Sequence, residues 1–158
     1  MTEVRRAGPD DADEIMRLRT VMFAGMPQAS PPEPGPWLAA GAEVLRRQLA
    51  DPADRVASFV VPGEQGLAAC VVGAIDERLP GPGNPTGWKG YVYNVATDSA
   101  YRRRGFSRAC MQALLGWFAE RGVTSVDLRA SPDGEPLYAS LGFARTKDPA
   151  MRCFIAER

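Results

Sequence analysis

The apolar positions between residues 91 and 122 form the clearest pattern in the chain, and they predict a strand followed by a helix. Residues 91–97 are mostly aromatic or β-branched, which is typical of a strand. A set of apolar residues then recurs every three or four positions and lines one face of a helix: Phe106, Ala109, Cys110, Ala113, Leu114, Trp117 and Phe118. Gly122 stands where a helix C-terminal glycine is expected.

The same patterns over the rest of the chain predict a mixed α and β protein. Further strands are expected at 3–7, 55–62, 67–75, 125–130 and 153–155. Further helices are expected from Pro9, from about Pro36 and over 133–141. Buried stripes on the first two helices are expected at Ile15, Leu18 and Met22, and at Leu38, Leu45 and Leu49. The strand–helix–strand order over 91–130 requires its two strands to be parallel neighbours or nearly so.

Two further stretches, one rich in proline and one rich in acids, are interpreted from their composition. Residues 24–36 hold five prolines in thirteen positions and cannot be helix or sheet, so they form either a substrate-facing loop or a connector. The acids Asp10, Asp11, Asp13 and Glu14 are interpreted as helix-start residues, not as a metal cluster.

Composition narrows the classes of function. The 158 residues suit one domain, residues 1–158, and the 19 basic and 19 acidic residues balance, which argues against a nucleic-acid binder. Histidine is absent, which excludes histidine triads, histidine bases and histidine metal sites. The chain shows no apolar run of membrane-spanning length and no signal-peptide core at 1–6, so a cytoplasmic protein is expected. Cys70, Cys110 and Cys153 lack metal-ligand spacing and are expected to be buried reduced thiols.

The turn between strand and helix has the features of an anion site. The first N–H groups of a helix lack internal partners, and its N-terminus carries a partial positive charge. Gly105 allows close approach of a ligand, and Arg102, Arg103 and Arg104 add charge. The stretch 102–107 therefore predicts a phosphate or pyrophosphate cradle, although a solvated basic turn remains an alternative. It is neither a Walker loop nor a dinucleotide fingerprint.

Two motifs resemble those of the GNAT superfamily of N-acetyltransferases. Arg102-Arg103-Arg104-Gly105-Phe106-Ser107 is similar to its acetyl-CoA-binding motif, with serine where the family has glycine or alanine. The stretch 137–143, Leu-Tyr-Ala-Ser-Leu-Gly-Phe, is similar to its C-terminal signature. The resemblance implies a single-domain α/β GNAT fold with an α+β mixed sheet, and a cleft where strand 91–97 parts from strand 125–130. It also implies that acetyl-CoA is bound by the motif and by Val95, Ala96 and Thr97.

The resemblance further implies acetyl transfer to an amine by direct attack on the thioester. Tyr138 matches the tyrosine that protonates the departing thiolate, and its alternative role is that of a core tyrosine. Histone-acetylating relatives place a glutamate where this chain has Tyr91, so a base of that kind is missing. Asp76 and Glu77 could serve as the base, but they are better explained as solvated residues of a hairpin. Loss of the amine proton through ordered water is a further alternative.

The second motif departs from the family at two further positions. Ser131 and Gly134 stand where many relatives have asparagine and alanine, seven and four residues before the tyrosine.

The acceptor cannot be named from the sequence. Trp37, Trp88, Tyr91 and Tyr93 could line its pocket, and too few acids are present to predict a polycationic substrate. The expected acceptor is a small-molecule or peptide amine, with no nucleic-acid or membrane partner, and a homodimer remains open. The alternatives are a non-catalytic acyl-CoA-binding regulatory module and a nucleotide-phosphate binder unrelated to CoA.

Overall fold

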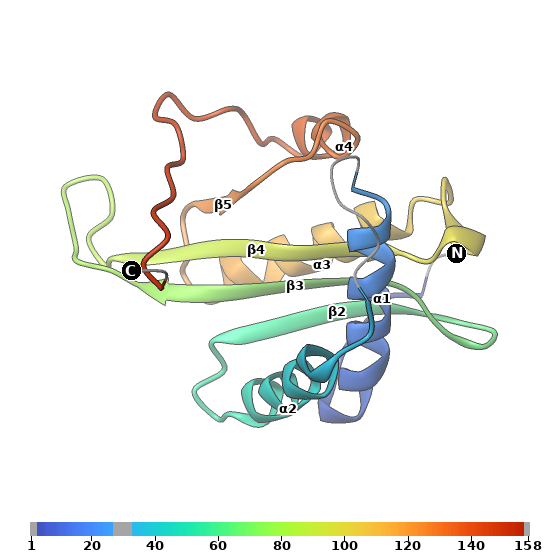
Figure 1. Ribbon diagram of the computed structural model, residues 1–158. Coiled ribbons are helices and arrows are strands. Elements are labelled where there is room, and N and C mark those ends of the chain that lie inside the picture. Colours follow the sequence, from blue (N-terminus) through green and yellow to red (C-terminus); the bar gives the residue numbers. More distant parts are fainter. Residues whose placement is uncertain (1–2, 27–32, 157–158) are drawn as a thin grey trace.

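Five strands form one mixed sheet in the computed structural model, which describes residues 3–26 and 33–156 (Figure 1). The strand order is β1-β2-β3-β4-β5, with bounds Arg5–Arg6, Val56–Gly63, Gly66–Glu77, Trp88–Thr97 and Val126–Leu128. The first four are antiparallel neighbours, and β5 pairs with β4 in parallel, as the crossover order predicts.

Helices cover both faces of this sheet. One face carries α1 (Ala12–Ala24) and α2 (Pro36–Ala50), the opposite face carries α3 (Phe106–Glu120), and α4 (Glu135–Ser140) follows β5 (Figure 1). Short 3₁₀ turns precede α1, at Pro9–Asp11, and follow β4, at Ser99–Tyr101. No helix among residues 3–26 and 33–156 is long and apolar enough to cross a membrane.

The sheet separates two apolar cores. Val72 and Ala96 pack with Ile15 on the α1 side, whereas Val71 packs with Leu114 on the α3 side. Because alternate strand residues point to opposite faces and both faces are covered, β2 and β3 read as continuous apolar runs.

A β-bulge in β4 redirects the side chains of the central strand. Val72 pairs with Asn94 but the next residue, Gly73, pairs with Val92, so Tyr93 has no partner on β3. The extra residue places Val92 in the α3 core while Asn94 and Ala96 face α1. Bulges are common beside active sites because they re-aim side chains.

Three expectations from the sequence are wrong. The strand at 153–155 does not form, because a strand needs a pairing neighbour and pairing in the described residues ends with β5. Cys153 is exposed, unlike Cys70 and Cys110, although all three thiols are free. Met22, Leu38 and Leu49, which were expected to be buried, are only partly buried, although all three pack against the core. Of the stretch 24–36, residues 27–32 lie outside the described part of the chain.

Candidate active site

A cleft opens where β4 and β5 part. Their pairing joins Gly90–Val92 to Val126–Leu128, and β4 continues to Thr97 without a neighbour on that side among the described residues. The cleft has a volume of about 480 Å³. It lies between the end of α1, the end of β4 at residues 95–97, the arginine-rich turn at 102–107 and α4. We call the turn at 102–107 the basic turn and the cleft the basic cleft. The sequence predicted a site at this parting.

The basic turn presents free backbone donors to the cleft. Gly105 precedes α3 with a φ of 77°, and Arg103 is also left-handed, with a φ of 65°. Because glycine has no side chain, Gly105 cannot cap the first N–H groups of α3. A Cβ at Gly105 would meet nothing within 4 Å, so the space beside the helix N-terminus is open. An anion can therefore reach these donors.

The arginines of the turn do not all face the cleft. Arg102, Arg103 and Arg108 line it, and none of the three has a carboxylate partner within the described residues. Arg104 lies over the Tyr101 ring instead, 5.3 Å from its centroid, and does not line the cleft. Every other predicted cofactor residue lines it: Val95, Ala96, Thr97, Gly105, Phe106 and Ser107.

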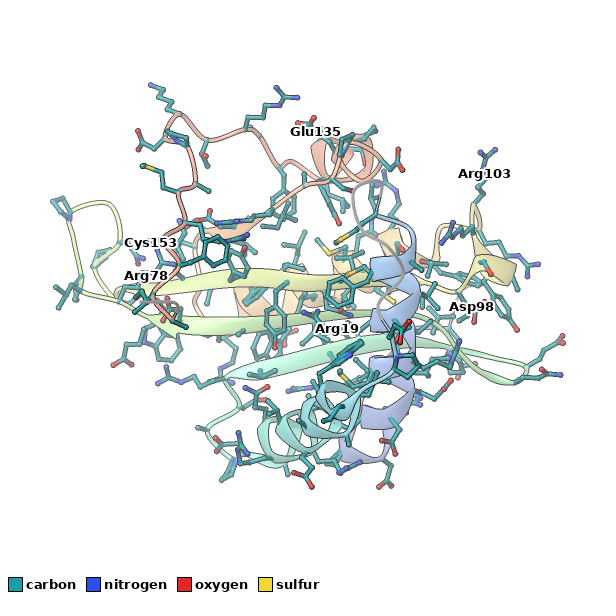
Figure 2. The ribbon with its side chains drawn as sticks, viewed as in Figure 1. Arg19, Arg78, Asp98, Arg103, Glu135 and Cys153 are labelled. Atoms are coloured by element: carbon teal, nitrogen blue, oxygen red, sulfur yellow. The ribbon has the colours of Figure 1, made fainter. Side chains whose placement is uncertain are left out.

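An ion-pair network fixes the turn to α1. Arg17 binds Asp98 at 2.8 Å and Glu14 at 2.7 Å, and donates to the Leu67 carbonyl at 3.0 Å. The hydrogen bond from Arg17 holds the pKa of both carboxyl groups below their usual range. The Asp98 side chain also accepts a hydrogen bond from Ala100 N, which closes the turn. Figure 2 shows Asp98 and Arg103 on the same side of α1.

Ser107, which replaces the family's glycine or alanine, has a local partner. Its hydroxyl is hydrogen-bonded to the Thr97 hydroxyl. The bond joins the end of β4 to the first turn of α3, so the serine strengthens the cradle's frame.

Tyr138 is held in the cleft by the C-terminal cap of α4. Phe143 N donates to the Tyr138 carbonyl and Gly142 N to the Ala139 carbonyl, which is the Schellman arrangement. Gly142 adopts the positive φ that this cap requires. Phe143 consequently packs edge-on against the Tyr138 ring, with centroids 6.0 Å apart. This cap explains why a Gly-Phe pair follows the tyrosine in the sequence.

The environment of Tyr138 favours its neutral phenol. Burial raises the pKa of the Tyr138 hydroxyl. Tyr138 also lines a second cavity of about 240 Å³, termed the strand cavity, which includes Tyr91, Tyr93 and Arg129 and shares Met22, Met26, Val95 and Ser131 with the basic cleft. The Tyr138 side chain therefore lies where the two cavities meet.

The residues considered as bases lie elsewhere. Asp76 pairs with Lys89 in the sheet, at the opposite end of β3 from the cleft, and binds Arg78 at 2.8 Å. Glu77 binds Arg55 at 3.2 Å. Neither residue lines the basic cleft or the strand cavity, and they are hairpin residues.

The aromatic residues that were expected to line the acceptor pocket do not all lie at one cavity. Tyr91 and Tyr93 line the strand cavity. Trp37 and Tyr93 line a further cavity beside it. Trp88 packs under Arg55 instead, 4.6 Å from its ring centroid.

Sequence reasoning missed the wall of the cleft that α1 supplies. Val21 and Met22 line it, yet nothing in their pattern distinguishes them from ordinary helix-end residues. Gly25 and Met26 also line it, and they belong to the stretch 24–36, for which a substrate-facing loop was one of the two expected roles. Arg108 was also missed, although it lies one residue beyond the basic motif; its guanidinium donates to Ser140 and so joins α3 to α4.

Known proteins are similar to this chain in sequence or in fold. A mycothiol acetyltransferase from Nocardioides sp. is 30% identical over an alignment of 159 residues, gaps included, that covers 90% of this chain and 49% of that protein. The chain thus spans about half the length of that relative. A GCN5-related N-acetyltransferase from Ralstonia eutropha has a TM-score of 0.79 at 27% identity, covering 97% of this chain and 99% of that one. A predicted acetyltransferase of Clostridium acetobutylicum, solved with acetyl-CoA, has a TM-score of 0.78 at 21% identity, covering 97% of this chain and 96% of that one.

The family assignment rests on a match that contains both motifs. The model of the acetyltransferase (GNAT) family matches residues 23–143, which include the basic turn, Tyr138 and the Gly-Phe cap. The match covers well over half of the chain, and the fold agrees with it. The protein belongs to the acetyltransferase (GNAT) family.

Proposed function

We propose that this protein transfers an acetyl group from acetyl-CoA to a primary amine by direct attack on the thioester. The observation that carries the proposal is the position of Tyr138, which lines both the basic cleft and the strand cavity. A molecule held by the basic turn can then meet an acceptor from the strand cavity beside a neutral phenol.

The residues of the basic cleft fit acetyl-CoA, the donor that this family uses. Arg102, Arg103 and the N–H groups at 105–107 hold the pyrophosphate, and Arg108 adds charge from the next position. Residues 95–97 offer backbone groups of β4 to the pantetheine arm, because β5 no longer pairs there. Arg104 is left out of this set since it stacks on Tyr101.

Tyr138 assists the transfer as a proton donor. The amine nitrogen bonds to the acetyl carbon, and the carbon–sulfur bond breaks with its electron pair on sulfur. The phenol protonates the sulfur, the nitrogen loses its extra proton to water, and the phenolate regains a proton from water. A tyrosine, with a pKa of about 10, is protonated at neutral pH, and this pKa lies close enough to that of a thiol, about 8.5, for a positioned phenol to hydrogen-bond or donate to the leaving sulfur as the bond breaks. Such acid catalysis contributes about 10²–10⁴-fold.

Direct attack is favoured by the positions of the thiols. Cys70 and Cys110 are fully buried and Cys153 is exposed, and none of the three lines the basic cleft or the strand cavity. Burial raises the pKa of Cys110 to about 12, so that thiol stays protonated at neutral pH. A cysteine carrier of the acetyl group therefore has no candidate here.

Few acidic side chains lie where they could remove the proton of the attacking amine. Asp133 is the one acidic residue lining the basic cleft among the described residues, and the strand cavity has none. Proton loss through water suits an α-amino group, with a pKa of about 7.7–8.0, better than a lysine amine near 10.4. The favoured acceptor is therefore a small molecule or peptide end carrying such an amine.

Tyr138→Phe tests the role of the phenol. The variant keeps the ring and its packing on Phe143, so affinity for CoA should be unchanged, while turnover with a good amine should fall at least about tenfold. Steady-state release of the CoA thiol and calorimetry of CoA binding measure the two quantities. Unchanged turnover would remove Tyr138 from the reaction.

One observation favours a second function, a non-catalytic acyl-CoA-binding module: among the residues that the structure describes, none lining the strand cavity is an acid that could serve as a base. A panel of primary amines incubated with acetyl-CoA distinguishes the two. Transfer to any amine supports the enzyme, whereas tight acetyl-CoA binding with neither transfer nor slow hydrolysis supports the module.

A further inference from the structure

A third cavity adjoins the strand cavity and has apolar walls. It has a volume of about 260 Å³ and is termed the side cavity. It lies between α1, α2 and the sheet, and its walls include Met16, Trp37, Leu45 and Val72. The side cavity shares Tyr93 and Asn94 with the strand cavity, so the bulge of β4 forms the junction of the two.

Arg19 stands in the side cavity in a fixed orientation. Its Nη1 donates to the Asn94 side-chain oxygen at 2.9 Å, and its guanidinium stacks over the Phe23 ring at 4.8 Å. Asn94 is only 2% exposed and donates in turn to the Cys70 sulfur at 3.5 Å. In Figure 2, Arg19 lies on the opposite side of α1 from Asp98 and Arg103. It therefore does not belong to the pyrophosphate cradle.

Within residues 3–26 and 33–156, the positive charge of Arg19 is not neutralised by a carboxylate. A guanidinium has five N–H donors, and the bond to Asn94 uses one. No carboxylate among the described residues pairs with Arg19, in contrast to Arg17 two positions earlier. The side cavity and the strand cavity are lined by no described acidic residue, and Arg129 adds a second positive charge in the strand cavity.

This arrangement selects the charge of the acceptor. Positive groups facing a cleft attract anions and repel further cations, so a polyamine or polycationic sugar is disfavoured. A guanidinium with free donors is suited to a carboxylate, because the planar fork matches two carboxylate oxygens. The apolar walls of the side cavity suit an aliphatic or aromatic side chain.

We infer that the acceptor is an amine bearing a carboxylate and an apolar side chain, such as a hydrophobic amino acid or a short peptide ending in one. Arg19 binds the carboxylate, and the side cavity takes the apolar group. The inference rests on the proposed function, because it assumes that the amine is acetylated beside Tyr138. The anion subsite itself can be measured without turnover.

Calorimetry on the protein saturated with CoA tests the subsite with product-like probes. N-acetyl-L-phenylalanine carries the carboxylate, N-acetyl-L-phenylalaninamide lacks it, and spermidine serves as a polycation. The acid should bind at least about tenfold more tightly than the amide, as expected for a charge-assisted pair. Arg19→Gln should abolish that difference by weakening the acid alone.

Arg47→Gln is the matched control. Arg47 is an exposed residue of α2 that lines neither the side cavity nor the strand cavity, so its replacement removes the same charge without touching the subsite. The preference for the acid should survive in this variant.

Equal binding of acid and amide, absence of binding by both, or tighter binding of spermidine would each overturn the inference. The same holds if Arg47→Gln abolishes the preference as fully as Arg19→Gln does. Failure of the proposed function gives a different result: no amine is acetylated, including phenylalanine, whether or not the acid binds.

Discussion

Gly134 is the residue that lets Tyr138 take its position. A Cβ at 134 would lie 2.9 Å from the Tyr138 ring and 3.3 Å from the Ser131 hydroxyl, so an alanine would force the ring to move. The resemblance to the family motif implies alanine at this position, and the glycine found here leaves room for the Tyr138 ring. The departure from the family motif therefore affects the local packing of the Tyr138 ring.

Gly134→Ala should lower turnover while CoA affinity is unchanged, because it displaces the phenol and leaves the basic turn intact. A displacement approaching 1 Å can cost up to about 100-fold, and a loss of about tenfold is expected. Steady-state kinetics and CoA calorimetry measure the two effects. Gly116→Ala is the control, since a Cβ there meets nothing within 4 Å and its turnover should not change. Wild-type turnover in Gly134→Ala would mean that the ring position is not critical.

Among the elements, the packing of α3 on the sheet depends on two glycines that no sequence pattern marked. A Cβ at Gly73 would lie 2.9 Å from Leu114 and 3.0 Å from Phe118, and one at Gly90 would lie 2.9 Å from Phe118. The side chains of α3 therefore pack directly against the backbone of β3 and β4 at these two glycines. This close approach sets where the N-terminus of α3, and with it the cradle, meets the end of β4.

Gly73→Ala should destabilise the protein by overpacking, by about 1–3 kcal/mol, and lower the melting temperature by several degrees, about 2–4 °C per kcal/mol. Gly116→Ala should act in the opposite direction, raising stability by up to about 1 kcal/mol, because it removes a glycine from an exposed helix position. Thermal unfolding by circular dichroism compares both. A melting temperature for Gly73→Ala equal to or above that of the wild type would contradict the close packing.

The sequence predicted those elements whose signals are local. The turn at 102–105 and α3 lie where they were expected, because the apolar helix pattern and the glycine before it are signals carried by adjacent residues, while anion binding there stays a prediction. The bulge at Tyr93 was not foreseen, since it depends on the register with β3. The strand at 153–155 was expected from side-chain preference, and it fails because preference supplies no pairing partner. Arg19 was missed because its partner, Asn94, is 75 residues away.

Over the whole molecule, ion pairs couple stability to pH. The pKa values of Asp11, Glu14, Asp54 and Asp98 are all held below their usual range, each chiefly by a hydrogen bond from an arginine. A carboxyl whose pKa is lower folded than unfolded stabilises the fold above its unfolded pKa, near about 4, and this stabilisation is lost as the pH falls through the folded value.

The melting temperature should therefore be nearly constant from about pH 7 to pH 5 and fall steeply below about pH 4. Asp98→Asn should flatten part of that fall, since it removes one titrating partner of Arg17. Thermal melts in a pH series measure both profiles at constant ionic strength. A wild-type melting temperature independent of pH between 5 and 3 would show that these pairs contribute nothing.

The most direct test of the account is calorimetry of acetyl-CoA binding to the wild type, Gly105→Glu and Gly116→Glu. Both variants add the same side chain to α3 or its cap, but only Gly105 faces the cleft, and its left-handed backbone also disfavours a side chain. Tight binding by the wild type and Gly116→Glu, with binding abolished in Gly105→Glu, is the predicted result. A folded wild-type protein that does not bind acetyl-CoA, or a Gly105→Glu variant that binds as tightly as the wild type, would contradict the cradle and the function built on it.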